Sequence, residues 1–130
     1  MAQHSDPADL LVCVKCRQAG AAPDDAERPG SVLFRRLAEM PIDGVRVLPV
    51  ECLSNCSQGC TIALRGTGRW SYVYGRFDPA QDAAVVVDGA AKYAATGDGL
   101  VPWRERPEHF RKNCIARIPP IDPVPSLGDC

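Results

Sequence analysis

The sequence lacks any apolar run long enough to cross a membrane: its longest apolar stretches span a few residues, whereas a transmembrane helix needs roughly 20. Residues 1–9 are polar and acidic, without the apolar core of a secretory signal. Strong net charge is also absent, because 15 basic and 16 acidic residues leave a net charge of −1. Such a surface is poorly suited to holding a polyanion. These absences predict a cytoplasmic protein that binds neither membranes nor nucleic acid.

Histidine is scarce. The two histidines, His4 and His109, belong to no recognisable nucleophile or zinc-protease pattern, so we interpret both as exposed residues and predict no enzyme activity. With 130 residues, of which 45% are hydrophobic and 24% charged, the chain fits one ordinary globular domain better than a disordered segment or a coiled coil.

What the sequence does contain is cysteine, seven residues in all. In a reducing compartment, this number indicates metal binding or redox chemistry rather than structural disulfides. Five of the cysteines form two groups: a C-x2-C pair (Cys13, Cys16) and a C-x3-C-x3-C run (Cys52, Cys56, Cys60). The single cysteines are expected to lie outside any metal site, Cys114 as a small buried hydrophobe and Cys130 as a terminal thiol.

Each cysteine group follows a predicted strand. Residues 10–14 form a short apolar run typical of a strand buried on both faces. Residues 31–40 predict a helix with Ser31 as its N-cap, and residues 45–51 predict a second strand, which Pro49 places at a sheet edge. Strand, helix and strand in succession give two parallel strands whose C-terminal ends share one edge. The two cysteine groups should therefore meet within roughly 10 Å.

The second half of the chain predicts a hairpin and a helix. Residues 61–64 and 70–76 flank a glycine-containing turn, with three alternating aromatic residues expected in the core. A helix is expected over residues 78–95, beginning at an N-cap Asp78. We therefore predict an α/β fold with a mixed four-stranded sheet, a parallel pair plus an antiparallel hairpin, and flanking helices. Residues 1–97 would form the domain, and the proline-rich residues 98–130 an extended arm packed on it.

Four thiolates suit tetrahedral zinc or an iron-sulfur cluster, and spacing alone does not separate the two. A zinc ribbon usually has glycines beside each pair, and Gly59 is the one glycine within these groups. A [2Fe-2S] cluster needs two cysteines on each iron and backbone N–H groups near its sulfides, which the small polar residues 54–58 would permit. A metal-free redox dithiol is a third reading, disfavoured because no helix is predicted to start promptly after Cys16.

Residues 50–56, Val-Glu-Cys-Leu-Ser-Asn-Cys, resemble the second cysteine pair of the thioredoxin-like [2Fe-2S] ferredoxins and of the related small subunit of respiratory complex I. The predicted order of strands and helices resembles theirs as well. More closely, residues 13–17, 52–60, 68–75 and 99–107 are similar to an uncharacterised bacterial family of predicted metal-binding proteins, often encoded beside cobalamin-synthesis genes. This closer likeness covers nearly the whole chain.

The resemblance implies a thioredoxin-like fold with one [2Fe-2S] cluster on Cys13, Cys16, Cys52 and Cys56. It further implies an electron carrier with a redox partner protein, a homodimer, and a client in cobalamin biosynthesis. The sequence departs from the ferredoxins in two ways: its first pair is more closely spaced, and Cys60 has no counterpart there. Cys60 is therefore a possible substitute for Cys16 or Cys56. A structural protein or one that handles zinc or cobalt is the alternative.

Several charged residues near the cysteine groups and the hairpin have two readings. Lys15, Arg17, Arg65 and Arg69 either compensate the negative charge of a cluster or attract an acidic partner, or they belong to an ordinary solvated surface. Glu51, directly before Cys52, is expected to point to solvent.

Overall fold

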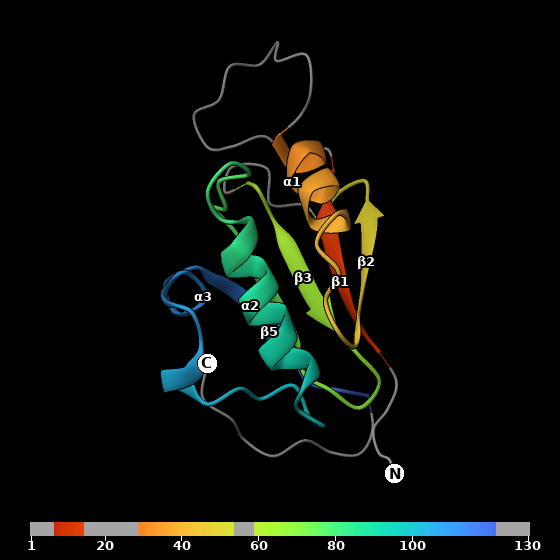
Figure 1. Cartoon of the computed structure of the whole chain (residues 1–130). Helices are drawn as coiled ribbons and strands as arrows, with labels where there is room; N and C mark the ends of the chain where they lie inside the picture. The colour runs from red at the N-terminus through yellow and green to blue at the C-terminus, as the bar shows by residue number, and fades with distance from the viewer. Residues whose placement is uncertain (1–6, 15–28, 54–58, 122–130) are drawn as a thin grey trace.

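The computed structural model describes residues 7–14, 29–53 and 59–121. Five strands, three α-helices and one 3-10 helix make up the described chain (Figure 1). In chain order they are β1 (Ala8–Cys13), α1 (Pro29–Ala38), β2 (Val45–Val50), β3 (Ile62–Arg65), β4 (Ser71–Tyr74), α2 (Ala83–Ala94), η2 (Trp103–Glu105), α3 (Glu108–Lys112) and β5 (Cys114–Ile118).

The strands form one mixed sheet in the order β2-β1-β3-β4-β5. The pair β1 and β2 is parallel, and every other pair is antiparallel. This confirms the predicted parallel pair and the predicted hairpin of β3 and β4. The predicted count of four strands is wrong, because β5 pairs with β4 and extends the sheet by one strand.

The two parallel strands differ in burial as their sequences predict. All six residues of β1 are buried, because the strand lies between β2 and β3. β2 is only partly buried and forms one edge of the sheet. An edge position tolerates Pro49, which has no N–H to donate to a further strand.

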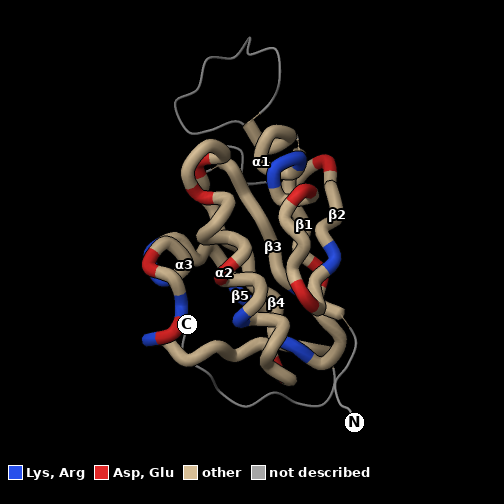
Figure 2. Tube along the Cα trace, viewed as in Figure 1, with Lys and Arg blue, Asp and Glu red and all other residues tan. Residues whose placement is uncertain are grey.

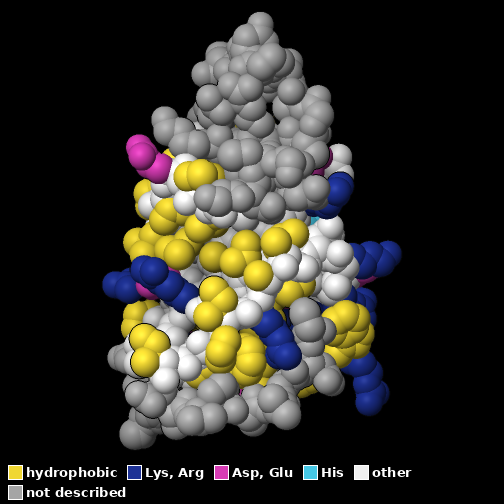
Figure 3. Space-filling view, turned by 180° about the vertical axis from the view of Figure 1, so that it is seen from behind, with side chains coloured by type: hydrophobic (Ala, Val, Ile, Leu, Met, Phe, Trp, Pro, Cys, Tyr) yellow, Lys and Arg dark blue, Asp and Glu magenta, His cyan; other side chains and the backbone are white. Residues whose placement is uncertain are grey.

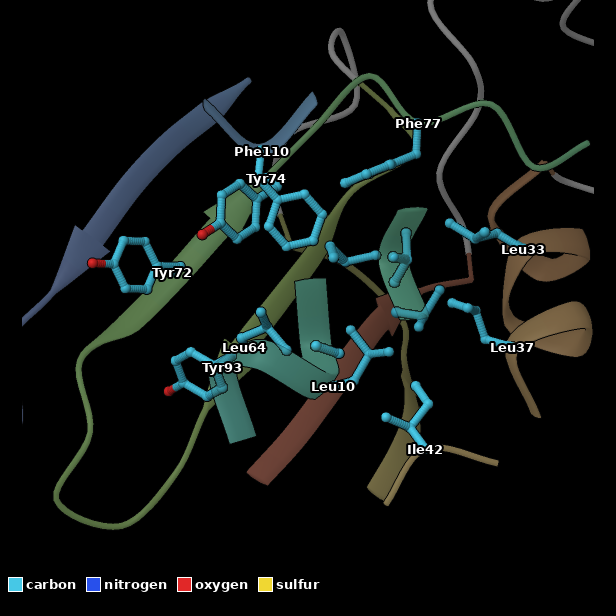
Figure 4. Packing of buried hydrophobic residues seen from close by; sticks show 14 of the residues in the cluster. Leu10, Leu33, Leu37, Ile42, Leu64, Tyr72, Tyr74, Phe77, Tyr93 and Phe110 are labelled. Atoms are coloured by element: carbon cyan, nitrogen blue, oxygen red, sulfur yellow. The ribbon is translucent and has the colours of Figure 1, made fainter. Parts of the chain in front are cut away.

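The core lies between the sheet and the helices α1 and α2, which cover the same face (Figures 1 and 4). Leu33 and Leu37 of α1 are fully buried against the sheet, and Tyr93 of α2 packs beside Tyr72 and Tyr74 of β4. The aromatic face of the hairpin is therefore a core surface, as predicted. Burial of a large apolar side chain typically contributes about 2 kcal/mol, so this layer is a main source of stability.

Both predicted helix starts are wrong. α1 begins at Pro29, whose ring fixes φ at a helical value, so the helix includes Ser31 instead of being capped by it. α2 begins at Ala83 and not at Asp78. The Asp78 carboxylate accepts the Ala80 N–H at 2.8 Å, while the Asp78 N–H donates to the Asp82 carboxylate at 2.7 Å. Asp78 therefore closes a turn before the helix.

The expected extended arm after residue 98 is instead partly regular. Pro102 and Pro107 directly precede η2 and α3 with φ values of −54° and −55°, so these prolines start short helices and do not hold the chain extended. After α3 the chain forms β5, which contains the β-branched residues Ile115 and Ile118.

The face of the sheet opposite the helices carries apolar side chains with arginine or lysine side chains among them (Figure 3). Leu11, Leu48, Ala63 and Val73 occupy this face in paired positions, because alternate residues of a strand point to opposite faces. Acidic and basic residues are spread along the chain with no block of one sign (Figure 2). Among the described residues, no helix has the length and apolar character needed to span a membrane.

Candidate metal centre

The C-terminal ends of β1 and β2 lie side by side. Cys13, the last residue of β1, is in register with Val50, the last residue of β2. The Val14 N–H donates to the Val50 carbonyl at 2.9 Å, which continues the pairing beyond both strands. The Cys13 thiol donates to the carbonyl of Glu51 at 3.6 Å. The predicted meeting of the two cysteine-bearing segments is therefore confirmed by their backbone and by one thiol contact.

Cys13 and Cys52 differ in exposure. The Cys13 side chain is 1% exposed, whereas Cys52, two positions after β2, is exposed. The Glu51 side chain is exposed as predicted, and its backbone carbonyl accepts the Cys13 thiol. Of these two cysteines, Cys13 is thus buried in the protein and Cys52 is exposed at the same edge of the sheet.

Cys60 lies at this edge too, but on the other face of the sheet. It is fully buried and packs in the core with Val12 and Ile62, which face the helices. Its N–H and carbonyl pair with the carbonyl and N–H of Phe77 at 3.3 and 3.2 Å. Cys13 alternates with Val12 and so points to the face away from the helices. Cys60 therefore has the surroundings of a core residue.

The other cysteines are divided between the described and undescribed parts of the chain. Cys16, Cys56 and Cys130 lie outside the described residues, so three predictions fall there. Within residues 7–14, 29–53 and 59–121, no three His, Cys, Asp or Glu side chains gather as a metal site would require. Cys114 is half-buried at the start of β5 and pairs in register with Tyr74, three strands away from β1.

Arg65 and Arg69, two of the residues considered as compensating charges for a cluster, lie away from the cysteine edge. Arg65 stands in register with Asp9 at the start of β1, and Arg69 follows in the hairpin turn. Both belong to the end of the sheet opposite Cys13, so neither guanidinium adjoins the cysteine edge. Both line a separate groove at that end.

His109 is not an exposed residue, contrary to its sequence interpretation. Its Nε2 lies 2.8 Å from the Gly75 carbonyl. A carbonyl only accepts, so Nε2 carries the proton of this hydrogen bond. The ring stacks on Phe77 with centroids 4.2 Å apart, and Nδ1 lies 4.0 Å from the Asp82 carboxylate. His109 thus supports Phe77, whose backbone in turn pairs with Cys60. Only the fold of the C-terminal segment brings it there, and no local motif signals it.

Thiol chemistry of the thioredoxin type would place a helix N-terminus directly after the C-x2-C pair. Residues 15–28 lie outside the described residues, so the absence of a helix directly after Cys16 stays a prediction.

Residues 10–120 match the family described as "Protein of unknown function (DUF1636)". The chain belongs to this family. No curated protein matches it.

Two solved structures share the fold of this DUF1636 protein. One is a thioredoxin-like [2Fe-2S] ferredoxin from Aquifex aeolicus, with a TM-score of 0.55 and 18% identity over 95% of this chain and 100% of the ferredoxin. The other, the wild-type thioredoxin-like [2Fe-2S] ferredoxin of the same organism, has a TM-score of 0.53 and 16% identity over 86% and 99% of the two chains. At such low identity, the likeness establishes a thioredoxin-like fold.

Proposed function

We propose that this protein is a one-electron carrier that holds one [2Fe-2S] cluster on Cys13, Cys16, Cys52 and Cys56. The observation that carries the proposal is the contact between the ends of the two parallel strands, where the Cys13 thiol reaches the carbonyl of Glu51, next to Cys52. The shared fold with two ferredoxins supports the same reading.

The donors at this edge have the right chemistry for such a cluster. Thiolates are the usual ligands of iron-sulfur clusters, and each iron takes two. Cys13 and Cys52 come from different groups, so each can pair with its own near neighbour in sequence, Cys16 or Cys56. A thiolate has no proton to donate, so ligation requires Cys13 to give up its hydrogen bond to Glu51.

The placement of Cys60 argues against its role as a substitute ligand. Its side chain is fully buried in the core on the helix side of the sheet, while Cys13 belongs to the opposite face. For both thiols to bind one centre, one of them would have to leave its packed position. We therefore assign Cys60 to the core and the four ligand roles to the other grouped cysteines.

The different exposure of Cys13 and Cys52 indicates where an electron would enter and leave the protein. When bound, the cluster accepts and returns one electron. Cys13 is held inside the protein, which limits water access, and Cys52 is exposed. A partner protein would approach at Cys52, the exposed one of these two ligands.

Zinc is the second candidate, because four cysteine thiolates also suit a closed tetrahedral site. Cobalt handling belongs to the same alternative. Two further parts of the proposal rest on the family resemblance alone: a homodimer and a client in cobalamin biosynthesis. The proposed cytoplasmic location rests on the sequence, which has no apolar run long enough to cross a membrane. We also propose that residues 98–130 belong to the same domain as residues 1–97, since β5 pairs with β4.

The test is a one-electron titration of anaerobically purified protein. We expect the visible absorption to bleach with about one electron per chain and to return on reoxidation. Cys13→Ser and Cys52→Ser should each lose this reversible absorption, whereas the matched variants Cys60→Ser and Cys114→Ser should retain it. A colourless protein, or loss of the absorption only in Cys60→Ser, would refute the ligand assignment.

A further inference from the structure

A groove opens at the end of the sheet opposite the candidate metal centre, with a volume of about 700 Å³. Cys13 lies four positions after Asp9, which lines the groove, and this corresponds to roughly 13 Å along β1. The groove is therefore distinct from the cysteine edge. Its size lies within the range of roughly 300–1,000 Å³ that is typical of sites for small molecules.

The floor of the groove is a charged triad built by strand register. Asp9 of β1 stands directly opposite Arg46 of β2 on one side and Arg65 of β3 on the other. Arg46 Nη2 lies 2.7 Å from Asp9 Oδ1, and Arg65 Nε lies 3.2 Å from Asp9 Oδ2. Each carboxylate oxygen thus holds one guanidinium in a fixed position.

The triad leaves guanidinium donors for a ligand. Arg46 contacts Asp9 through Nε and Nη2, and Arg65 contacts it through Nε. Within the described part of the chain, Nη1 of Arg46 and both Nη groups of Arg65 have no such contact. The two arginine side chains are 61% and 57% exposed, while Asp9 is only 10% exposed. Their free N–H groups therefore face the solvent side of the carboxylate.

A third guanidinium strengthens the positive charge. Arg69 also lines the groove and is buried, with Nε donating to the Thr96 carbonyl at 3.0 Å. Gly66 makes this position possible, because a Cβ there would lie 2.4 Å from Arg69 Nη1. Within the described triad, Arg46 and Arg65 together carry one more positive charge than the Asp9 carboxylate neutralises. Fixed guanidiniums are the preferred partners of carboxylates and phosphates.

One wall of the groove is apolar. Ile118, Pro119, Pro120 and Ile121 line it, and Ile118 and Ile121 are 55% and 98% exposed. Large apolar side chains beside an unbalanced cluster of arginines suit a ligand with both characters.

We propose that this groove binds a small organic anion whose carboxylate or phosphate group lies on Arg46 and Arg65 and whose apolar part lies against Ile118. The proposal does not depend on the cluster, since it uses none of the cysteines.

Isothermal titration calorimetry at low ionic strength tests it with four probes: phenyl phosphate, 4-phenylbutyrate, inorganic phosphate and phenol. We expect saturable binding of at least one of the two phenyl anions, tighter than that of inorganic phosphate, and no binding of phenol. The tighter of the two phenyl anions identifies whether the groove prefers a phosphate or a carboxylate.

Variants locate the binding. Arg46→Gln and Arg65→Gln should each weaken binding of the phenyl anion about tenfold or more. Arg36→Gln, the same change on an exposed residue of α1, should leave it unchanged. Ile118→Thr should reduce the affinity for the phenyl anion toward that for inorganic phosphate. Thermal unfolding checks that each variant folds, and the NMR signals of the Arg46 and Arg65 Nε–H groups in the unaltered protein give a readout without any substitution.

The proposal is overturned if neither phenyl anion saturates, if Arg36→Gln weakens binding as much as the groove variants, or if the Nε–H signals do not shift. Binding of hexaglutamate without binding of either phenyl anion would also overturn it, because the groove would then be a contact for an acidic protein segment.

Discussion

Replacing Gly89 with alanine is expected to destabilise the protein, although alanine ordinarily favours a helix by about 1 kcal/mol over glycine. Gly89 lies in the middle of α2, and an added Cβ would lie 2.2 and 2.3 Å from two ring atoms of Phe110. Phe110 is itself buried and packs on Tyr74 with ring centroids 4.3 Å apart. The ring cannot simply move aside.

Overpacking of this kind costs about 1–3 kcal/mol, and a contact with two ring atoms places Gly89→Ala at or beyond the upper end of this range. After the gain in helix propensity, we expect a net loss of about 2 kcal/mol and a fall in the melting temperature of roughly 8 °C. Thermal unfolding measures both values.

Gly97→Ala is the matched control, because nothing lies within 4 Å of a Cβ at that position. Phe110→Leu should relieve the clash, so the double variant should be at least about 1 kcal/mol more stable than the sum of the single effects predicts. If Gly89→Ala stabilises the protein, or if the two changes are additive, the packing of α2 against α3 described here is refuted.

Three further predictions concern other parts of the fold. Burial raises the pKa of Tyr74 and Tyr93 above the ordinary value of 10.0. The unfolded chain therefore loses these protons at a lower pH than the folded protein does. The free energy of unfolding should be full below a pH of about 10 and fall above it by up to about 1.4 kcal/mol per pH unit for each tyrosine. Denaturant titrations across this pH range measure the fall. Arg69→Gln should cost about 1–3 kcal/mol in thermal unfolding, because the guanidinium bonds the carbonyls of Thr96 and Ala94 at the end of α2; a change no larger than that of Arg36→Gln would contradict this capping role. Cys60→Ser should lower the free energy of unfolding by about 1–3 kcal/mol, because it buries a hydroxyl in the core. The variant should still bind as much iron as the unaltered protein. A loss of iron would contradict the assignment of Cys60 to the core.

The strand and helix pattern predicts the framework of the fold because its signals are local. The apolar run of β1, the proline in β2 and the alternating aromatic residues of β4 each follow from periodicity or from the chemistry of one residue. Parallel pairing then follows from chain order, and with it the meeting of Cys13 with the segment that carries Cys52.

The sequence misses features that depend on distant contacts. Asp78 has the residue type of a helix N-cap, but its carboxylate accepts the Ala80 N–H in a turn, and α2 begins only at Ala83. The C-terminal prolines suggest an extended arm, yet the segment forms β5 because β4 offers a free edge. His109 is likewise placed by the fold.

The charged groove could not be predicted for the same reason. Asp9, Arg46 and Arg65 are far apart in the sequence, and only the register of three strands brings them together. Arg65 does not adjoin Cys13 because β3 runs antiparallel to β1, which carries the C-terminal end of β3 away from Cys13. Strand direction and register decide which charged residues meet.

The central claim is that the two cysteine groups together bind one [2Fe-2S] cluster. The most direct measurement is the content of iron, acid-labile sulfide and zinc in protein purified without oxygen. The account predicts about two irons and about two sulfides per chain, without stoichiometric zinc. About one zinc per chain with no sulfide would contradict it.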